Sequence, residues 1–557
     1  MPLSCIVVAM FQSLRAETET WAMWSAVERA AEIGRRVTMR RNFPRTGAIP
    51  AILIVLFLSG CGAMPPQTDR RNEPAFNDPE TTTLGQRALA EAQRHSGQSG
   101  LLILDRGYQA FLQRAALIEA AERSIDAQYY IWNGDRSGRY LAHRLMLAAD
   151  RGVRVRLLLD DINVGNRDAM LGLLDRHPNI EIRIFNPSAA RTKVGKILAF
   201  ASEFRRLNRR MHNKTFVVDA AMGIVGGRNI GDEYFDLHPE MNFLDRDVLA
   251  QGPVVQAMAS NFDAYWNSAW SYPINLLSHG REGDAATIAR FEATRAAAAD
   301  TTGFPQAPVE DAVAAHATLQ REMERAVWAP AELVFDPPAQ EMTADTDQPQ
   351  RTARTLQRIV EQTDFELLIE SAYLILGDSQ LHLLEQLRAR GVRVDAVTNS
   401  LASNDLTANH AGYARRRPAM LAAGLNLFEL KPDAAACVDW IAATDYCDKG
   451  ALSLHAKSAV FDRKTIYVGS FNVNLRSIYL NGETVLVIHS RELAQRVAQD
   501  IAAAMAPANS WQLHEDGAGD LIWSSPGGET WTHEPETGLW RRFKSALIRL
   551  LPIEKYL

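Results

Sequence analysis

From Leu101 onward, short apolar runs that suit β-strands alternate with longer stretches that suit helices. Residues 124–131 alternate as a strand does, residues 137–151 have a helical pattern, and residues 153–159 form another apolar strand. The same strand, helix and strand order returns over residues 365–398. This alternation predicts an α/β protein.

The pattern occurs twice along the chain. The sequence R-G-V-R-V stands at residues 151–155 and again at 390–394. Residues 212–229 and 455–472 are a second pair of similar segments, separated by nearly the same interval. An interval that repeats in this way indicates an internal duplication, so we expect two similar α/β/α lobes with mixed β-sheets.

The duplication sets the expected domain boundaries. We expect the first lobe over residues 97–272 and the second over 331–510, with an Ala-rich insertion or linker over 273–330 between them. Residues 511–557 are expected to form a C-terminal extension that contains a basic amphipathic helix. A chain of 557 residues has enough material for two such cores.

The N-terminal region has the pattern of a targeting segment. Residues 1–38 lack a secretory pattern, and we interpret them as an over-extended or untranslated start. Residues 39–60 combine an Arg-rich head, an apolar run and small residues before Cys61, which is typical of a lipoprotein signal peptide. The alternative is a transmembrane anchor, but the apolar run is short of the ~20 residues that span a bilayer.

We therefore predict cleavage before Cys61, lipidation of that cysteine and a flexible tether over residues 61–96. The protein would be a membrane-anchored lipoprotein that faces the periplasm from the inner or the outer membrane. Of the remaining cysteines, Cys437 and Cys447 lie close together and would either form a disulfide or remain as free thiols.

The two similar segments fit one template, H-x-K-x4-D-x6-G-[GS]-x-N. The polar members are His212, Lys214, Asp219 and Asn229 in the first box and His455, Lys457, Asp462 and Asn472 in the second. Because side chains alternate along a strand, the histidine and lysine of each box point to one face. The small residues after the second strand let the asparagine approach a bound group. Two such sets would form a pocket for one tetrahedral anion, which indicates phosphoryl chemistry.

These paired boxes resemble the phospholipase D superfamily, and further segments resemble bacterial cardiolipin synthases of the C type. The segments are Q-Y-Y-I-W (128–132), R-G-V-R-V-R-L-L-L-D-D (151–161), R-L-N-R-R-M-H-N-K (206–214), G-G-R-N-I-G-D-E-Y-F (226–235), T-N-S-L-A-S-N-D (398–405) and H-A-G-Y-A-R (410–415). The resemblance covers residues 97–557 and implies the phospholipase D fold.

The resemblance also implies a division of roles. His212 would attack phosphorus to form a phosphohistidine, and His455 would act as acid and base, although the symmetry of the boxes allows the reverse. The lysines and asparagines would bind the phosphate, while Asp219 and Asp462 are mainly structural in the family. A carboxylate from the other half orients each histidine, and local pattern favours Asp247 over Asp245, together with Glu483. The scheme needs no metal and no cofactor.

The expected reaction is phosphatidyl transfer to phosphatidylglycerol to make cardiolipin, with phosphatidylethanolamine or a second phosphatidylglycerol as donor. The alternatives are a phospholipase D that releases phosphatidic acid, a metal-independent phosphodiesterase or nuclease, and a lipid-binding scaffold without activity. A net charge of −6 argues against nucleic acid as a partner. With both boxes in one chain, a monomer is expected to be active.

Two basic segments lie outside the boxes. Arg205, Arg206, Arg209 and Arg210 precede His212 and would form either a basic rim around the pocket or a solvated helix face. Residues 538–552 place Trp540, Phe543, Leu547 and Leu551 near helical spacing, with Arg541, Arg542, Lys544 and Arg549 mostly elsewhere. That helix would either lie in a membrane interface or dock on the body of the protein.

Overall fold

The computed structural model describes most of the chain after the predicted signal peptide. The predicted start, the signal peptide and Cys61 lie outside the described residues. The described residues are 64–67, 71–165, 167–278, 283–343, 348–441, 446–448, 450–525, 529–551 and 553–557.

The first half of the chain forms a mixed sheet of nine strands within the described ranges. Their order across the sheet is β10 (Val327–Ala329), β1 (Ser99–Leu104), β8 (Asp247–Gln251), β6 (Met222–Gly226), β5 (Thr215–Val218), β2 (Ser124–Tyr129), β3 (Arg154–Asp160), β4 (Ile180–Phe185) and β9 (Ser271–Pro273). Strands β2, β3 and β4 are parallel, and the other pairs are antiparallel.

The second half repeats this arrangement. The order is β11 (Ala331–Phe335), β18 (Thr484–His489), β17 (Thr465–Gly469), β16 (Lys457–Phe461), β12 (Glu366–Ser371), β13 (Arg393–Asn399), β14 (Asn426–Leu430), β19 (Ser510–Glu515), β20 (Leu521–Ser524) and β21 (Thr530–Trp531). Its parallel strands are β12, β13 and β14, the counterparts of β2, β3 and β4. The duplicated α/β architecture predicted from the sequence is therefore confirmed.

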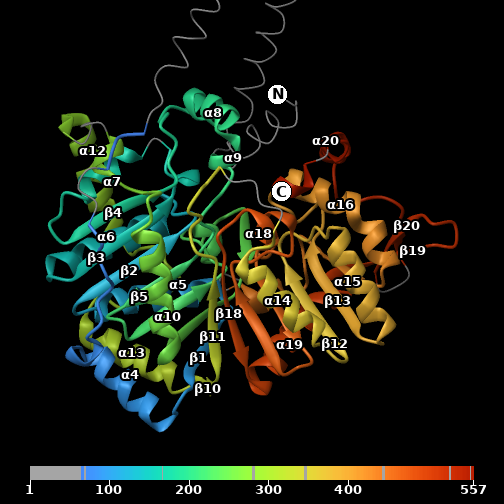
Figure 1. Ribbon diagram of the computed structural model, residues 1–557, viewed down its shortest axis with the longest axis horizontal. Helices are drawn as coiled ribbons and strands as arrows, with labels where there is room; N and C mark the ends of the chain where they lie inside the picture. The colour runs from blue at the N-terminus through green and yellow to red at the C-terminus, as the bar shows by residue number, and fades with distance from the viewer. Residues whose placement is uncertain are drawn as a thin grey trace, which may run out of the picture.

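Helices cover both faces of each sheet, and Figure 1 shows the first lobe on the left and the second on the right. The helices of the first half are α4 (Thr83–Arg94), α5 (Gly107–Ala120), α6 (Arg136–Asp150), α7 (Asp168–Leu174), α8 (Lys193–Ser202), α9 (Phe204–Leu207), α10 (Pro253–Trp266), α11 (Asn275–Ser278), α12 (Ala285–Ala298) and α13 (Ala312–Met323). Those of the second half are α14 (Arg351–Glu361), α15 (Asp378–Ala389), α16 (Thr407–Ala422), α17 (Cys437–Trp440), α18 (Leu475–Tyr479), α19 (Arg491–Met505) and α20 (Leu539–Arg549).

One continuous apolar core joins the two lobes. It contains Val255 of α10 and Val497 of α19, together with side chains from the facing surfaces of both sheets, such as Val225 and Val468. A buried core of this kind fixes the lobes relative to each other, because separating them would expose its apolar surface to water. Residues at the junction of the two lobes are therefore held on a rigid frame.

Two expected boundaries differ from the structure. Residues 71–96, predicted as part of the tether, fold onto the first lobe. The backbone N–H groups of Glu73 and Ala75 donate hydrogen bonds to the side chains of Asn267 and Asp263, and Leu84 of α4 is buried. The predicted insertion ends in β10, which pairs with β1 of the first sheet. The change from the first sheet to the second falls at Pro330, next to the expected start of the second lobe at residue 331.

The predicted C-terminal extension also differs, because its first part continues the second sheet as β19, β20 and β21. Burial of Trp511, Leu513 and Trp523 in the core of the second lobe explains why these strands belong to it. Cys437 and Cys447 form a disulfide, which decides between the two alternatives left by the sequence. None of the helices in the described ranges is long and apolar enough to cross a bilayer.

Candidate active site

Each box lies on a β-hairpin, formed by β5 and β6 in the first half and by β16 and β17 in the second. Asp219 and Asp462 stand at the turns, where both have positive φ angles (52° and 50°). Asp219 accepts hydrogen bonds from the backbone N–H groups of residues 122–124, and Asp462 from those of residues 364–366. Both carboxylates thus brace the start of the neighbouring strand, about 20 Å along the hairpin from the histidines.

The histidines stand at the opposite end of the hairpins, and each is held by the other lobe. The His212 N–H donates to Gly482 O at 2.8 Å, and the His455 N–H donates to Leu244 O at 2.7 Å. Strand β15 (Ala451–Leu454) leads into His455 and pairs in parallel with β7 (Met241–Leu244). The same cross-lobe contact is therefore made twice.

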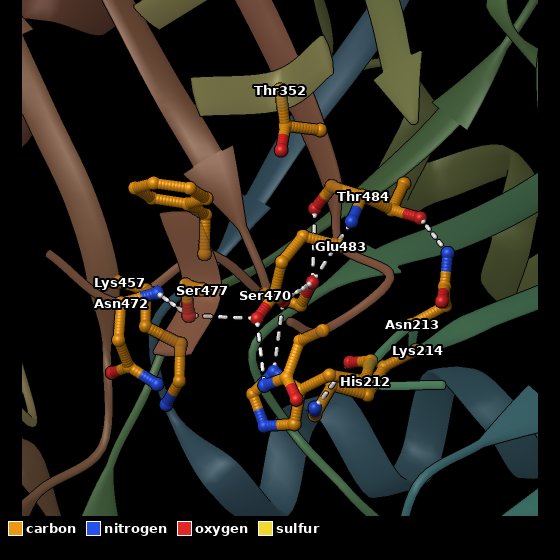
Figure 2. Close-up of polar contacts among 12 residues, drawn as sticks. His212, Asn213, Lys214, Thr352, Lys457, Ser470, Asn472, Ser477, Glu483 and Thr484 are labelled. Atoms are coloured by element: carbon orange, nitrogen blue, oxygen red, sulfur yellow. Dashed lines mark hydrogen bonds and ion pairs between the residues drawn. The ribbon is translucent and has the colours of Figure 1, made fainter. Parts of the chain in front are cut away.

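The residue after each of these carbonyls supplies a carboxylate. Glu483 Oε2 lies 2.8 Å from His212 Nδ1, and both side chains are buried. Ser470 donates to Glu483 Oε2 at 2.5 Å, while Ser477 and Asn481 donate to Oε1 at 2.7 and 3.2 Å. Figure 2 shows Glu483 at the centre of this group, with His212, Ser470 and Ser477 around it. The carboxylate is fixed by donors on both oxygens.

The carboxylate at His455 is Asp245, and the preference for Asp247 was wrong. Asp245 Oδ2 lies 2.5 Å from His455 Nδ1. Asp247 is instead the first residue of β8 and forms a buried ion pair with Arg114 at 2.9 Å. Sheet register explains the difference: Asp247 pairs with Gly226 and Val485 pairs with Gly469, so Asp247 is the counterpart of Val485 and Asp245 that of Glu483.

The small residues of the template leave room for these carboxylates. A Cβ atom on Gly227 would lie 2.1 Å from Asp245 Oδ1, so a larger residue would displace the carboxylate. Ser470 is the counterpart of Gly227, and its hydroxyl donates to Glu483. The template position occupied by Gly227 or Ser470 therefore contacts the carboxylate of each histidine–carboxylate pair.

Burial sets the charge state of the pairs. It lowers the pKa of His212 to about 4 against the opposing effect of Glu483. It lowers the pKa of His455 to about 3, with Lys457 acting in the same direction. Burial alone would raise the pKa of Glu483 and Asp245, but the facing histidines and lysines hold both below their usual values. At neutral pH each imidazole is neutral, with Nδ1–H directed at a carboxylate and the Nε2 lone pair available.

The lysines and asparagines lie around the histidines. Lys214 and Lys457 each donate to the backbone carbonyl of the histidine of their own box. Asn229 accepts from the Ile131 N–H and donates to Tyr234. Asn472 differs, because its buried side-chain oxygen has no hydrogen-bond partner among the described residues.

A pocket opens onto one histidine. His212 and Asn472 line it, but His455 does not. The other polar lining residues are Tyr130, Tyr373, Asn409, Asn474, Arg476, Asn481 and Tyr556, and the apolar ones are Ile162, Leu406, Ala408, Ile553 and Leu557. His455 instead contacts the rings of Tyr234 and Phe243, with ring centroids 5.1 Å away in each case.

Several of these lining residues were not identified from the sequence. Asn474 and Arg476 follow the second box closely, a position that could have marked them. Nothing in the sequence pattern indicated the C-terminal residues. Asn474 donates to Leu557 O, and Arg476 donates to Tyr556 O and to Asn208 of the first lobe. These hydrogen bonds hold Tyr556 and Leu557 between the two lobes.

The arginine run before His212 is neither a basic rim nor a solvated face. Three of the four arginines are buried, and only Arg205 is exposed. Arg206 donates to Asn186 and Pro187, and Arg210 pairs with Asp160. These contacts fix the loop that leads into His212.

One buried cluster outside the boxes has residue types that ligate metals. Among the described residues, His410, Glu429 and Glu534 offer ligand atoms within 4.8 Å of one another. Arg417 donates to both carboxylates, at 2.8 Å to Glu429 and 2.6 Å to Glu534. The guanidinium already supplies the positive charge that these carboxylates require.

Two duplicated lobes, each giving a neutral histidine held by a carboxylate of the other lobe, define a phospholipase D-type phosphotransfer enzyme. Comparison with known proteins agrees. The family model "Cardiolipin synthase, PLD-like domain" matches residues 115–266 and 356–505. The chain belongs to this family of phospholipase D-like proteins, and so to the phospholipase D-type phosphatidyltransferases.

Individual relatives extend the match over nearly the whole chain. Cardiolipin synthase C of Escherichia coli is 38% identical, over 85% of this chain and 99% of that protein. An uncharacterized protein of Helicobacter pylori is 30% identical, over 90% of this chain and 98% of its own length. The crystal structure of phosphatidylserine synthase from Haemophilus influenzae superposes with a TM-score of 0.52 at 13% identity, covering 85% of this chain and 99% of that one, which shows a shared fold.

Proposed function

We propose that the protein makes cardiolipin by transferring a phosphatidyl group to phosphatidylglycerol through a covalent intermediate on His212. The observation that carries the proposal is the pair of neutral imidazoles, each held through Nδ1 by a buried carboxylate of the other lobe. The likeness to cardiolipin synthase C supports the choice of lipids.

In the first step, His212 Nε2 attacks the phosphorus of the donor phospholipid. The P–N bond forms as the bond from phosphorus to the head-group oxygen breaks, and His455, protonated when the anionic substrate raises its pKa, gives its proton to the departing alcohol. The lysines and Asn472 would stabilise the charge on the non-bridging oxygens.

In the second step, the free hydroxyl of the phosphatidylglycerol head group attacks the same phosphorus. Its proton passes to His455, the new P–O bond forms, and the P–N bond to His212 breaks. The diester is restored as cardiolipin, His212 is neutral again, and His455 is protonated as it was before the first step, until it loses that proton to solvent when the product leaves. Two displacements replace a single difficult one, which is the advantage of nucleophilic catalysis.

His212 is the better candidate for the nucleophile because it lines the pocket, whereas His455 does not. We further propose that the protein reaches its lipids from the periplasmic side of a membrane, anchored through Cys61. The apolar run and the small residues before that cysteine support this location.

The test uses the purified chain in mixed micelles with labelled phosphatidylglycerol, with and without phosphatidylethanolamine, and mass spectrometry of the products. Label in cardiolipin is the expected result, and dependence on the ethanolamine lipid would name the donor. Phosphatidic acid alone would show that water is the acceptor and that the protein is a hydrolase.

Matched histidine variants complete the experiment. His212→Ala and His455→Ala should each lower turnover by at least about 10³-fold, because each residue belongs to a unit that acts together. His382→Ala is the control, because that imidazole lies on α15 with 69% of its side chain exposed. Turnover retained in both box variants would refute the proposed mechanism.

A further inference from the structure

Helix α20 is attached to the protein by one face only. Ser545 and Ile548 are both 6% exposed and face the body, where α20 packs against α16. Arg541 adds hydrogen bonds to the backbone carbonyls of Ala402 and Asn404. The position of the helix is therefore fixed by contacts that leave its opposite face unused.

That opposite face is strongly apolar. Ten large apolar side chains are exposed among the described residues, and half of them belong to this helix and the residue that follows it. They are Leu539 (82% exposed), Trp540 (62%), Phe543 (57%), Leu547 (57%) and Leu550 (76%). The other five are scattered over five different elements or loops. Scattered apolar residues are ordinary, but a gathered set marks an interaction surface.

The charged side chains of this helix and of the residues next to it in sequence all have one sign. Residues 538–552 contain four basic residues and no acidic residue. Lys544 and Arg549 are exposed, and Lys544 lies 5.4 Å from the centre of the Trp540 ring. A helix with aromatic and aliphatic side chains on one face and a basic flank suits a surface that is apolar inside and anionic outside.

The helix also stands beside the candidate active site. Ile553, Tyr556 and Leu557, a few residues beyond α20, line the pocket that contains His212. In Figure 1, α20 lies along the same upper edge of the molecule as α8 and α9. A surface docked on α20 would thus lie close to the pocket.

We propose that the outer face of α20 docks the protein on an anionic phospholipid bilayer, with the five apolar side chains in the head-group region. The choice of a lipid surface over a protein partner rests on the proposed function, which draws its substrates from a membrane. The surface itself rests on the exposed side chains and their charge.

The test is sedimentation with vesicles, using the full-length chain with Cys61→Ser so that no acyl chain at that residue adds affinity. Vesicles contain phosphatidylcholine alone or phosphatidylcholine and phosphatidylglycerol in equal parts. Phe543→Ser with Leu547→Ser should weaken binding to the mixed vesicles at least about tenfold, because both side chains would leave the apolar region. Lys544→Gln with Arg549→Gln should weaken binding only where phosphatidylglycerol is present, by about fivefold for each charge.

The matched control is Val313→Ser, which removes an apolar side chain that is 81% exposed on α13. Binding equal to that of the parent is expected for this control. Leu539→Ser with Leu550→Ser is a second pair on the outer face, and it decides the outcome if the first pair unfolds. Unchanged binding in a folded pair, or equal loss in the control, would overturn the proposal. Sedimentation records binding and not turnover, so this result is independent of the reaction assay.

Discussion

The two box histidines share a backbone arrangement but differ in their surroundings. The other lobe holds each histidine through one backbone carbonyl, which accepts from the histidine N–H, and one carboxylate, which contacts Nδ1. Around His212 the carboxylate has three further side-chain donors, and the imidazole lines an open pocket. Around His455 the carboxylate lies against Gly227, and the imidazole does not line that pocket. Both imidazoles contact aromatic rings, His212 that of Tyr130 and His455 those of Tyr234 and Phe243.

In the proposed mechanism, the two halves of the duplicated site have different roles. The backbone carbonyl and the carboxylate that hold the histidine are present in both halves, as the proposed mechanism requires if both imidazoles act on one phosphorus. The surroundings of the two imidazoles differ, and under the proposed function the lipid would enter on the side where His212 lines the pocket. We therefore expect changes in the shared parts to damage both halves equally, and changes in the diverged parts to separate them.

The largest effect should come from the shared carboxylates. Glu483→Gln and Asp245→Asn should each lower turnover by roughly 10² to 10⁴-fold, because an amide cannot hold the imidazole in the same tautomer and charge state. Steady-state rates in mixed micelles would measure this. Asp247→Asn is the matched control: it breaks a buried ion pair with Arg114 and should cost about 3 kcal/mol of stability, seen in thermal melts, without a comparable loss of turnover in the folded protein. Full turnover in Asp245→Asn would exclude that carboxylate from the site.

The second-largest effect is expected at Gly227 and Ser470, the small residues beside the two carboxylates. Gly227→Ser should lower turnover about 10²-fold, because its Cβ would collide with Asp245 and displace the carboxylate from His455. Ser470→Gly removes a single donor to Glu483 and should cost about tenfold. Rates of the two variants, compared at equal folded concentration, would show whether the order holds. A milder loss in Gly227→Ser than in Ser470→Gly would contradict the predicted asymmetry.

A smaller effect is expected on the open side of the site. Tyr556→Ala and Leu557→Ala remove the part of the pocket wall that the end of the chain supplies. Each should raise KM several-fold while kcat changes little, because the wall would contact the lipid in the ground state and the transition state alike. Titration of the phospholipid in mixed micelles at fixed detergent would separate the two constants. An unchanged KM in both variants would show that the tail does not contact substrate.

The smallest expected effect is a shift in the pH at which kcat/KM falls. An ordinary histidine loses its neutral form as pH falls through about 6.5. Burial lowers the pKa of His212 to about 4, so the loss of kcat/KM on the acid side, which follows protonation of this nucleophile, should have its midpoint near pH 4. The need for a proton on His455 sets the limb at higher pH. A profile of kcat/KM from acid to neutral pH gives the midpoint. A midpoint near 6.5 would mean that the nucleophile is not the buried, neutral imidazole described above.

Much of the fold could be predicted from the sequence, because a period of two or of 3.6 residues is a local property. The strand expected over residues 124–131 is β2, and the strand, helix and strand expected over 365–398 are β12, α15 and β13. The repeat of R-G-V-R-V indicated the duplication, since it leads into β3 and β13, which occupy equivalent places in the two sheets. The template likewise identified both histidines before any geometry was known.

The errors arose where a residue's role depends on distant contacts. Asp245 and Asp247 stand two positions apart, so strand periodicity places them on the same face and cannot choose between them. The choice depends on sheet register and on Arg114, which lies far away in the sequence. The arginines before His212 were compatible with a basic rim or a solvated face for a similar reason: their partners, such as Asp160, are remote in the sequence.

The identity of the nucleophile is the central claim, and a trapping experiment tests it most directly. The protein would be mixed with phosphatidylglycerol labelled in its phosphate, quenched within a turnover, digested and analysed by mass spectrometry under conditions that preserve phosphohistidine. The account predicts a phosphatidyl adduct on the peptide that contains His212. An adduct on the peptide that contains His455 would reverse the assignment and contradict the account.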